Sequence, residues 1–157
     1  MIRILFVCHG NICRSPMAEF IMKDLVRKAG LEERIQVASA ATSTEEIGNP
    51  VYPPARRELA RHGISSGGKR AVQLRREDYG AYDLLLAMDR WNLRNMERML
   101  GGDPEGKIHL LMEYTRSPER EIADPWYSGD FETTYRDVLE GCQGLLASLT
   151  EEKGGGK

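Results

Sequence analysis

Residues 2–16, IRILFVCHGNICRSP, decide the fold. Their first six residues, 2–7, form an almost continuous apolar run that only Arg3 interrupts, which is typical of a buried parallel strand. Pro16 suits the first turn of a helix, and apolar residues then recur at helical spacing up to Gly30. A strand is therefore followed by a tight loop and a helix, and the loop carries a thiol, a glycine and an arginine.

The rest of the chain alternates between strand patterns and helix patterns. In order, they cover residues 35–41 (strand), 53–60 (helix), 82–88 (strand), 90–100 (helix), 108–111 (strand) and 131–149 (helix). Residues 112–129 show little periodicity, and so long a loop in a compact domain usually has a function. We predict an α/β fold of a single domain, residues 1–150, with a four-stranded parallel sheet flanked by helices on both faces. Residues 151–157 are expected to form a flexible tail.

Composition limits the possible functions. The 157 residues carry a net charge of -2, which does not favour a nucleic-acid partner. No apolar run approaches the roughly 18 residues of a membrane span, so we expect no membrane insertion and a cytoplasmic protein. Cys8, Cys13 and Cys142 are an odd number of cysteines without a metal-type pair, which argues against a disulfide scaffold and for a reactive thiol. We expect neither a cofactor nor a metal site.

The loop from Cys8 to Ser15 has the composition of an anion site. Successive backbone N–H groups in such a turn form a nest for an anion, and the dipole of the following helix adds to it. Gly10 and Asn11 tolerate the left-handed backbone that such a nest needs. Arg14 presents a planar fork of donors that holds two phosphate oxygens at once. We therefore predict a phosphate-binding loop after the first strand, where α/β folds place their ligands.

Cys8 lies within the field of the same loop. Helix N-termini and nearby cations favour the thiolate form of cysteine, and the Ser15 hydroxyl can donate a hydrogen bond to it. The loop thus predicts attack of a thiolate on a bound tetrahedral oxyanion. The plainer interpretation is a small buried cysteine at a strand end, but it does not account for Asn11, Arg14 and Ser15 together.

Four stretches resemble the low-molecular-weight protein tyrosine phosphatase family. VCHGNICRSPMAE, residues 7–19, is similar to the Cys-x5-Arg-Ser loop of that family, and ADPWY, residues 123–127, resembles its general-acid loop. YDLLLAMD, residues 82–89, and SAATSTEEIGNP, residues 39–50, match as well. The resemblance extends over residues 2–149 and implies a metal-independent phosphoric monoester hydrolase that acts on phosphotyrosine in proteins.

The resemblance also implies the roles of the central residues. Cys8 would attack phosphorus, Arg14 and the loop amides would stabilise the charge, and Asp124 would protonate the leaving oxygen and then activate water. Because Cys8 must be ionised while Asp124 is protonated, activity is expected to peak on the acidic side of neutral. Asp-Pro alone is ordinary turn chemistry, but Trp126 and Tyr127 beside it favour a wall for a flat aromatic substrate.

Further residues are expected to support the loop. The resemblance implies a hydrogen bond between Asn11 and Ser39, and it implies that Cys13 pairs with Cys8 on oxidation, with a packed thiol as the alternative. His9, where many relatives carry leucine or threonine, is expected to line the crevice with Trp126 and Tyr127. The loop-support residues are His9, Gly10, Asn11, Ile12, Cys13, Ser15 and Ser39.

Several positions are given other roles or depart from the family. We interpret Asp89 as a helix N-cap rather than as a residue that orders the site from beneath, Trp91 as a packing residue and Cys142 as core. Ala38 replaces an aspartate that the family often carries, and KRAVQ, residues 69–73, replaces its His-x-Ala-Arg-Gln. The hydrogen-bond network around the loop is therefore expected to be different or absent.

Three alternative functions remain to be tested against a tyrosine phosphatase. A protein arginine phosphatase of the same family carries threonine where this chain has Ile12, which offers no hydroxyl. A thiol-coupled arsenate reductase needs a further cysteine pair, which Cys142 alone does not supply. A non-catalytic phosphopeptide-binding module would keep Arg14 but gain nothing from Cys8 with Asp124. We predict a tyrosine phosphatase whose partner is a phosphotyrosine protein, and a monomer with at most weak self-association.

Overall fold

The computed structural model describes residues 1–155, which contain one parallel sheet of four strands. In the order β2-β1-β3-β4, the strands are Ile35–Ala41 (β2), Ile2–Cys8 (β1), Leu84–Ala87 (β3) and Ile108–Leu110 (β4). β1 pairs over its whole length with β2 and on its other side with β3, which fits the continuous apolar run in its sequence. The predicted sheet is confirmed, although β3 is shorter than the predicted range 82–88.

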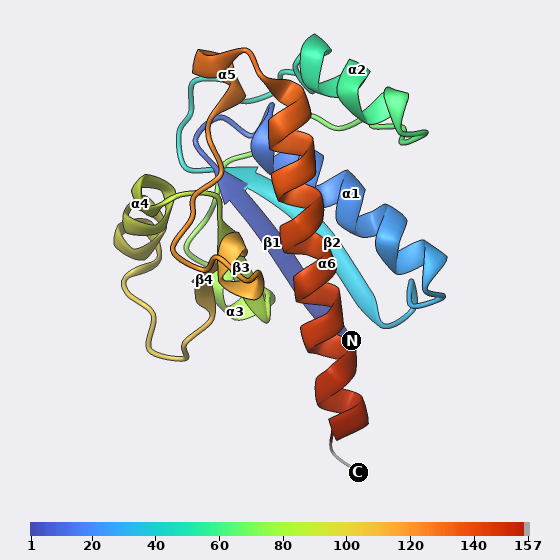
Figure 1. The fold of residues 1–157 in the computed structure, drawn as a ribbon. Helices are drawn as coiled ribbons and strands as arrows, with labels where there is room; N and C mark the ends of the chain where they lie inside the picture. The colour runs from blue at the N-terminus through green and yellow to red at the C-terminus, as the bar shows by residue number, and fades with distance from the viewer. Residues whose placement is uncertain (156–157) are drawn as a thin grey trace.

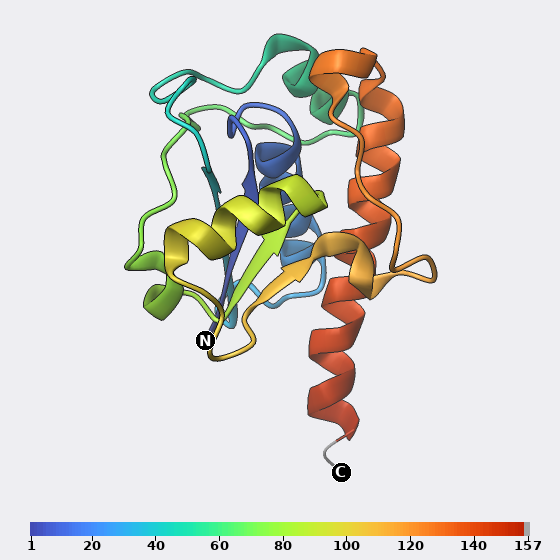
Figure 2. The same cartoon turned by 90° about the vertical axis from the view of Figure 1, so that its left-hand side faces the viewer.

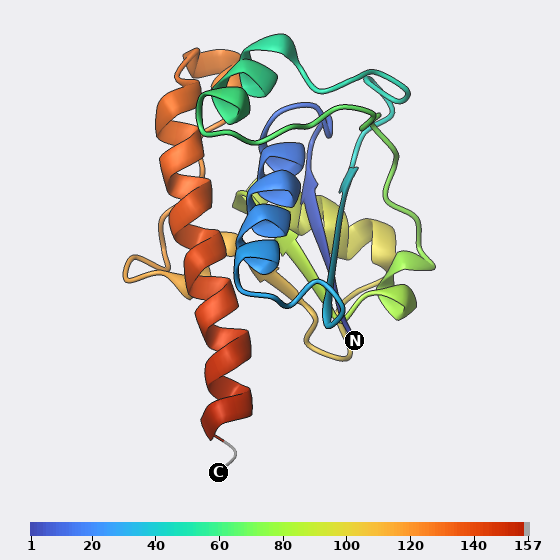
Figure 3. The ribbon, with the colours of Figure 1, turned by 90° about the vertical axis from the view of Figure 1, so that its right-hand side faces the viewer.

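Helices cover both faces of this sheet, as predicted (Figures 1, 2 and 3). α1 (Arg14–Lys28) and α6 (Phe131–Gly155) pack together on one face, and α4 (Arg90–Leu100) lies on the other. α2 (Pro53–Arg61) and α5 (Pro125–Ser128) lie beyond the carboxyl ends of the strands. Two further short helices are α3 (Asp78–Ala81) and the 3-10 helix η1 (Leu111–Tyr114).

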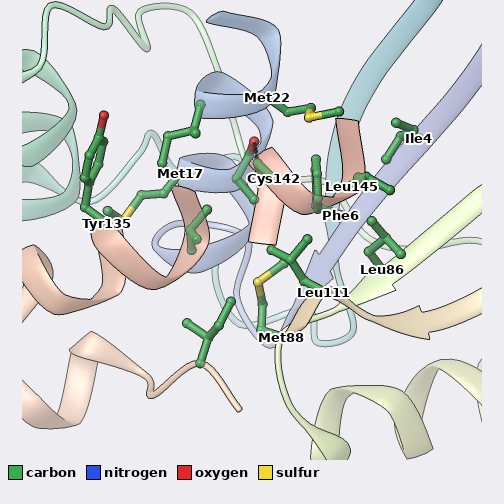
Figure 4. Close-up of a cluster of buried hydrophobic side chains, with 14 of the residues drawn as sticks. Ile4, Phe6, Met17, Met22, Leu86, Met88, Leu111, Tyr135, Cys142 and Leu145 are labelled. Carbon is green, nitrogen blue, oxygen red and sulfur yellow. Dashed lines mark hydrogen bonds between the residues drawn. The ribbon is translucent and has the colours of Figure 1, made fainter. Parts of the chain in front are cut away.

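Alternation along β1 divides the core into two layers. Ile4 and Phe6 pack into the cluster beneath α1 and α6, whereas Leu5 and Val7 pack into the cluster beneath α4. Figure 4 shows the larger layer, in which Cys142 of α6 lies among side chains of the sheet and α1. Cys142 is fully buried, which confirms the prediction that it belongs to the core.

α6 lies unusually close to η1 because it presents glycines there. A Cβ built on Gly144 would lie 1.9 Å from the carbonyl oxygen of Tyr114, and one on Gly141 would lie 2.6 Å from Cγ of Leu111. Only glycine lets the two backbones approach this far. The contact fixes the start of residues 115–124, the segment that returns to the carboxyl edge of the sheet and carries Asp124.

The structure departs from the sequence prediction in its short helices. α3, η1 and α5 contain four residues each, and four residues are too few to show a helical period. α1 begins at Arg14, two residues before Pro16. α6 continues past residue 149, where its apolar pattern ends, to Gly155. The predicted tail, residues 151–157, lies partly outside the described residues, and its flexibility stays a prediction.

Trp91 does not pack into the core, so that prediction is wrong. Met96 and Leu100 occupy the buried face of α4, while the Trp91 side chain is 59% exposed with the Arg94 guanidinium 5.8 Å from its ring centre. Trp91 precedes Met96 by five positions and Leu100 by nine, which places it about 140° and about 180° away around the helix, on the face opposite to them. Across the described residues, no helix is both long enough and apolar enough to span a bilayer.

Candidate active site

The loop between β1 and α1 is the floor of the candidate site. It is anchored where it leaves the sheet: the carbonyl oxygen of Cys8 accepts from the N–H of Thr42 at 2.9 Å, and that of His9 accepts from Ser43 at 3.0 Å. Asn11 has a φ of 59°, the one positive φ among the described non-glycine residues, which bears out its selection as a residue that tolerates left-handed backbone. Gly10, selected with it, does not adopt a positive φ.

A crevice of about 120 Å³ opens over this loop. It is lined by Cys8, His9, Gly10, Ile12, Cys13, Arg14, Glu45, Glu46, Asp124, Trp126 and Tyr127. The structure therefore brings the three predicted catalytic residues into one crevice, although Asp124 lies more than a hundred positions from Cys8 in the sequence. A larger surface groove of about 640 Å³ runs along the outer edge of β2 between Lys23 and Tyr82 and contains none of the predicted site residues.

The three remaining loop-support residues lie behind the crevice and form a chain of hydrogen bonds. Asn11 Nδ2 donates to Ser15 Oγ at 2.8 Å and to Ser39 Oγ at 2.9 Å, while its Oδ1 accepts from the N–H of Val72 at 3.1 Å. The Val72 contact fixes the orientation of the amide, so both hydrogens of Nδ2 are committed. The predicted Asn11–Ser39 hydrogen bond is thus present in the structure.

This chain also directs the proton of Ser15. Ser15 Oγ accepts from Asn11, so its own hydrogen is available to Cys8 Sγ, which lies 3.0 Å away. At the other end, Ser39 donates to Glu19 Oε1 at 2.6 Å and can therefore only accept from Asn11. The direction of every other bond in the chain leaves the Ser15 hydroxyl to donate to the sulfur of Cys8.

Glu19 and Lys69 complete the chain, and the sequence analysis assigned neither to the site. Lys69 Nζ donates to the carbonyl of Ser39 at 3.0 Å and lies 3.6 Å from Glu19 Oε1. Burial lowers the pKa of Lys69 from its ordinary value, against the opposing effect of Glu19. The network behind the loop is therefore present, in a different form that uses Lys69.

Arg14 is held from below by one edge of its guanidinium. Nη1 donates to Asp89 Oδ2 at 2.7 Å and to the carbonyl of Ile122 at 2.9 Å. Asp89 Oδ1 also accepts from the N–H of Asn92 at 2.8 Å, which confirms the predicted cap of α4 and shows that Asp89 contacts the site as well. The buried Nε of Arg14 has no partner among the described residues, so the edge of the guanidinium that carries Nε, unlike the Nη1 edge, can donate to an anion.

Electrostatics keep Arg14 charged in this position. Burial alone would lower the pKa of the guanidinium, but negative charge on Cys8, Asp89 and Asp124 raises it above its usual value. The Arg14 side chain is only 3% exposed, so its charge acts in a medium of low dielectric constant. The site therefore combines a permanent buried cation with the thiol group of Cys8.

Asp124 lies at the mouth of the crevice as the N-cap of α5. Its Oδ1 accepts from the N–H of Trp126 at 3.0 Å, and its Oδ2 lies 3.5 Å from Arg14 Nη2. The ring of Trp126 packs against Tyr52 with 4.8 Å between ring centres, whereas Tyr127 is 86% exposed. The predicted aromatic residues thus line the crevice next to the candidate acid.

Cys13 lies in the same crevice but has different properties. Burial, with smaller contributions from Cys8 and Asp124, raises the pKa of Cys13 to about 12, so its thiol is neutral at ordinary pH. All three cysteines are free in the structure. Pairing of Cys13 with Cys8 on oxidation stays a prediction. Among residues 1–150, whose side chains the structure describes, no group of three histidine, cysteine or acidic side chains is arranged to hold a metal ion.

Two crevice residues that the sequence analysis did not select are Glu45 and Glu46. Glu45 Oε2 lies 2.6 Å from His9 Nε2, so His9 lines the crevice as expected but with an acidic partner. Both glutamates lie within the stretch SAATSTEEIGNP, so the signal that could have identified them was its position directly after the second strand.

Comparison with known proteins agrees with this geometry. A family model described as "Low molecular weight phosphotyrosine protein phosphatase" matches residues 3–154. The low molecular weight protein-tyrosine-phosphatase YfkJ of Bacillus subtilis is 41% identical over 154 residues, with 98% of this chain and 99% of that protein covered. The low molecular weight phosphotyrosine protein phosphatase of Homo sapiens is 40% identical over 147 residues, with 91% and 92% covered.

Solved structures agree with the fold as well. The crystal structure of YfkJ superimposes with a TM-score of 0.94 over 98% of this chain and 97% of that one. A Drosophila protein whose structure is described as an arginine phosphatase is 33% identical, with a TM-score of 0.85 and coverage of 93% of this chain and 96% of that one. Because the similarity extends over nearly its whole length in both sequence and structure, this chain belongs to the low molecular weight phosphotyrosine protein phosphatase family.

Proposed function

We propose that the protein hydrolyses phosphotyrosine in proteins through a cysteinyl-phosphate intermediate, with Cys8 as nucleophile, Arg14 as phosphate clamp and Asp124 as general acid and base. One observation carries the proposal: the buried Nε of Arg14 has no partner among the described residues, while Cys8 and Asp124 line the same crevice. A buried donor without a partner is costly, and a phosphate oxygen would satisfy it.

In the first step, Cys8 Sγ attacks phosphorus in line with the bond to the tyrosine oxygen. The S–P bond forms as the P–O bond breaks, and Asp124 gives its proton to the departing phenolate oxygen. Arg14 Nε and Nη2 and the loop amides stabilise the charge on the equatorial oxygens. The aromatic rings of Trp126 and Tyr127 line the part of the crevice that would take the substrate ring.

In the second step, water attacks the phosphorus of the cysteinyl phosphate. Asp124, now ionised, takes a proton from the water as the new P–O bond forms and the S–P bond breaks. Inorganic phosphate leaves, and the thiolate of Cys8 is regenerated. Ser15 stabilises this thiolate in the free enzyme, because its proton is directed to Cys8 by Asn11.

A protein arginine phosphatase is the second candidate, since the Drosophila relative described above carries that name. Ile12 argues for tyrosine. Its side chain packs with Cys13 and Ala71 and lines the crevice, where it offers an apolar surface and no hydroxyl. The substrate class stays part of the proposal, as do a phosphotyrosine protein as partner, a cytoplasmic location and a monomeric state.

The test is steady-state hydrolysis of phosphotyrosine and phosphoarginine peptides from about pH 4.5 to about pH 8.5. We expect turnover of phosphotyrosine that peaks below neutrality, is abolished by Cys8→Ser and loses its acidic optimum with Asp124→Ala. Preference for phosphoarginine would show that Ile12 does not decide the substrate. Phosphopeptide binding without turnover would support a non-catalytic binding module instead.

A further inference from the structure

The crevice has two chemically different sides. Figures 2 and 3 show residues 42–50 and α5 on either side of the loop that follows β1. α5 contributes Trp126 and Tyr127 to the lining, whereas residues 42–50 contribute Glu45 and Glu46. We call Glu45 and Glu46, together with His9, the acidic wall.

The acidic wall is held in place by the backbone around it. The backbone N–H of Ser43 donates to the carbonyl of His9 at 3.0 Å, and the backbone N–H of Asn49 donates to the carbonyl of Glu46 at 2.9 Å. The Asn49 amide also donates to Glu46 Oε1 at 2.9 Å. A Cβ on Gly10 would lie 3.4 Å from Glu46 Cγ, so this side chain packs directly on the phosphate loop. The wall therefore needs no rearrangement to meet a substrate.

The wall is negative whatever the charge of His9. It contains two carboxylates and one imidazole, and Glu45 and His9 approach within 2.6 Å. Among the described residues that line the crevice, Arg14 is the one basic side chain besides His9, and it lies at the floor. Arg70 contacts the same segment, since its Nη1 donates to the carbonyl of Gly48, but Arg70 does not line the crevice.

Floor and wall thus carry opposite charges at different depths. In the proposed function the phosphate would bind at the unpartnered Nε of Arg14, whereas Glu45 lies nearer the rim, with a side chain that is 67% exposed. A peptide whose phosphotyrosine reaches Arg14 must place its neighbouring residues at that rim. There, carboxylates attract a basic side chain and repel an acidic one.

We propose that Glu45 and Glu46 select protein substrates that carry arginine or lysine beside the phosphotyrosine. The proposal rests on the proposed function, since it assigns a sequence preference to that same site. Because the contact is at an exposed rim, its effect is modest and salt-dependent. It acts on the peptide and not on the phosphate, so it changes kcat/KM between peptides more than it changes kcat.

The experiment compares two phosphotyrosine peptides that differ only in the flanking residues, arginine in one and aspartate in the other. We expect the parent protein to show a kcat/KM about threefold to tenfold higher for the arginine peptide. In the double variant Glu45→Gln, Glu46→Gln the ratio falls towards one. The control double variant Glu32→Gln, Glu33→Gln removes an equal charge from two exposed positions outside the crevice and keeps the parent ratio.

Salt supplies an independent measurement. At about 1 M salt the Debye length falls to about 3 Å, so the preference of the parent protein should shrink there. An equal kcat/KM for the two peptides, or the same ratio in the parent and the double variant, would overturn the acidic-wall proposal. Para-nitrophenyl phosphate, which has no flanking residues, separates the two hypotheses: its hydrolysis alongside a flat peptide ratio refutes the acidic wall alone, whereas no turnover of any substrate refutes the proposed function.

Discussion

Asn11 offers the sharpest test of how fold and chemistry depend on one side chain. It is 1% exposed, its backbone is left-handed with a φ of 59°, and its amide makes three hydrogen bonds. Two variants separate these contributions. Asn11→Ala loses the hydrogen bonds and keeps a Cβ in the left-handed conformation, whereas Asn11→Gly loses the same bonds but removes the Cβ and so relieves the backbone.

The expected free-energy changes follow from these contacts. Three buried hydrogen bonds contribute about 1 kcal/mol each, and alanine tolerates the left-handed region less well than asparagine by up to about 1 kcal/mol, which sums to roughly 3–4 kcal/mol for Asn11→Ala. Asn11→Gly avoids the strain but adds about 0.5–1 kcal/mol of backbone entropy to the unfolded chain. We therefore expect the glycine variant to be more stable than the alanine variant by about 1 kcal/mol.

Urea unfolding measures these stabilities, and hydrolysis of a phosphotyrosine peptide measures the chemistry. Both variants remove the hydrogen bond from Asn11 that orients the Ser15 hydroxyl towards Cys8. We therefore expect both to lower kcat for the phosphotyrosine peptide to the same extent, by about 100-fold. If the alanine variant is as stable as the glycine variant, the argument from backbone strain is wrong. If the glycine variant keeps activity close to the parent, the hydrogen-bond chain does not orient the Ser15 proton.

Three further predictions address packing, the buried ion pair and thiol reactivity. Gly144→Ala should destabilise the protein by about 3 kcal/mol in urea unfolding despite the helix propensity of alanine, and a stabilised variant would contradict the contact with η1. Lys69→Met should cost about 2 kcal/mol and lower kcat, because Glu19 loses its buried partner; Lys69→Arg should recover most of both, and unchanged stability in Lys69→Met would refute the pairing. Because burial raises the pKa of Cys13 to about 12, iodoacetamide at about pH 7 should label Cys8 and spare Cys13, with inorganic phosphate slowing the reaction; equal labelling of both, seen by mass spectrometry, would refute this.

The sheet could be predicted because its physics is local in the sequence. A central parallel strand is buried on both faces, so it must be almost continuously apolar, and residues 2–7 have this pattern. The helix boundaries at Arg90 and Leu100 followed from a cap and a following glycine in the same way. The loop from Cys8 to Arg14 was found because all its functional groups lie within seven residues.

The residues that sequence analysis missed are those whose partners are distant in the chain. Glu19 looks like a solvated residue of an amphipathic helix, and only the fold places it against Ser39, twenty positions away, and Lys69, fifty positions away. The same holds for Glu45, whose contact with His9 depends on how residues 42–50 leave the sheet. The periodicity of the sequence cannot predict such contacts, because they arise from the packing of segments that are distant in the chain.

Asp89 can be both the N-cap of α4 and a residue that supports Arg14 from beneath, so these two interpretations do not exclude each other. A carboxylate has two oxygens, and here Oδ1 caps α4 through Asn92 while Oδ2 holds Arg14 from beneath. Sequence pattern could detect the first contact, which spans three positions, but not the second, which spans seventy-five. Since one rigid group makes both contacts, the start of α4 fixes one edge of the guanidinium, and the opposite edge faces the crevice. The position of Arg14, the proposed phosphate clamp, thus depends on a helix cap on the other face of the sheet.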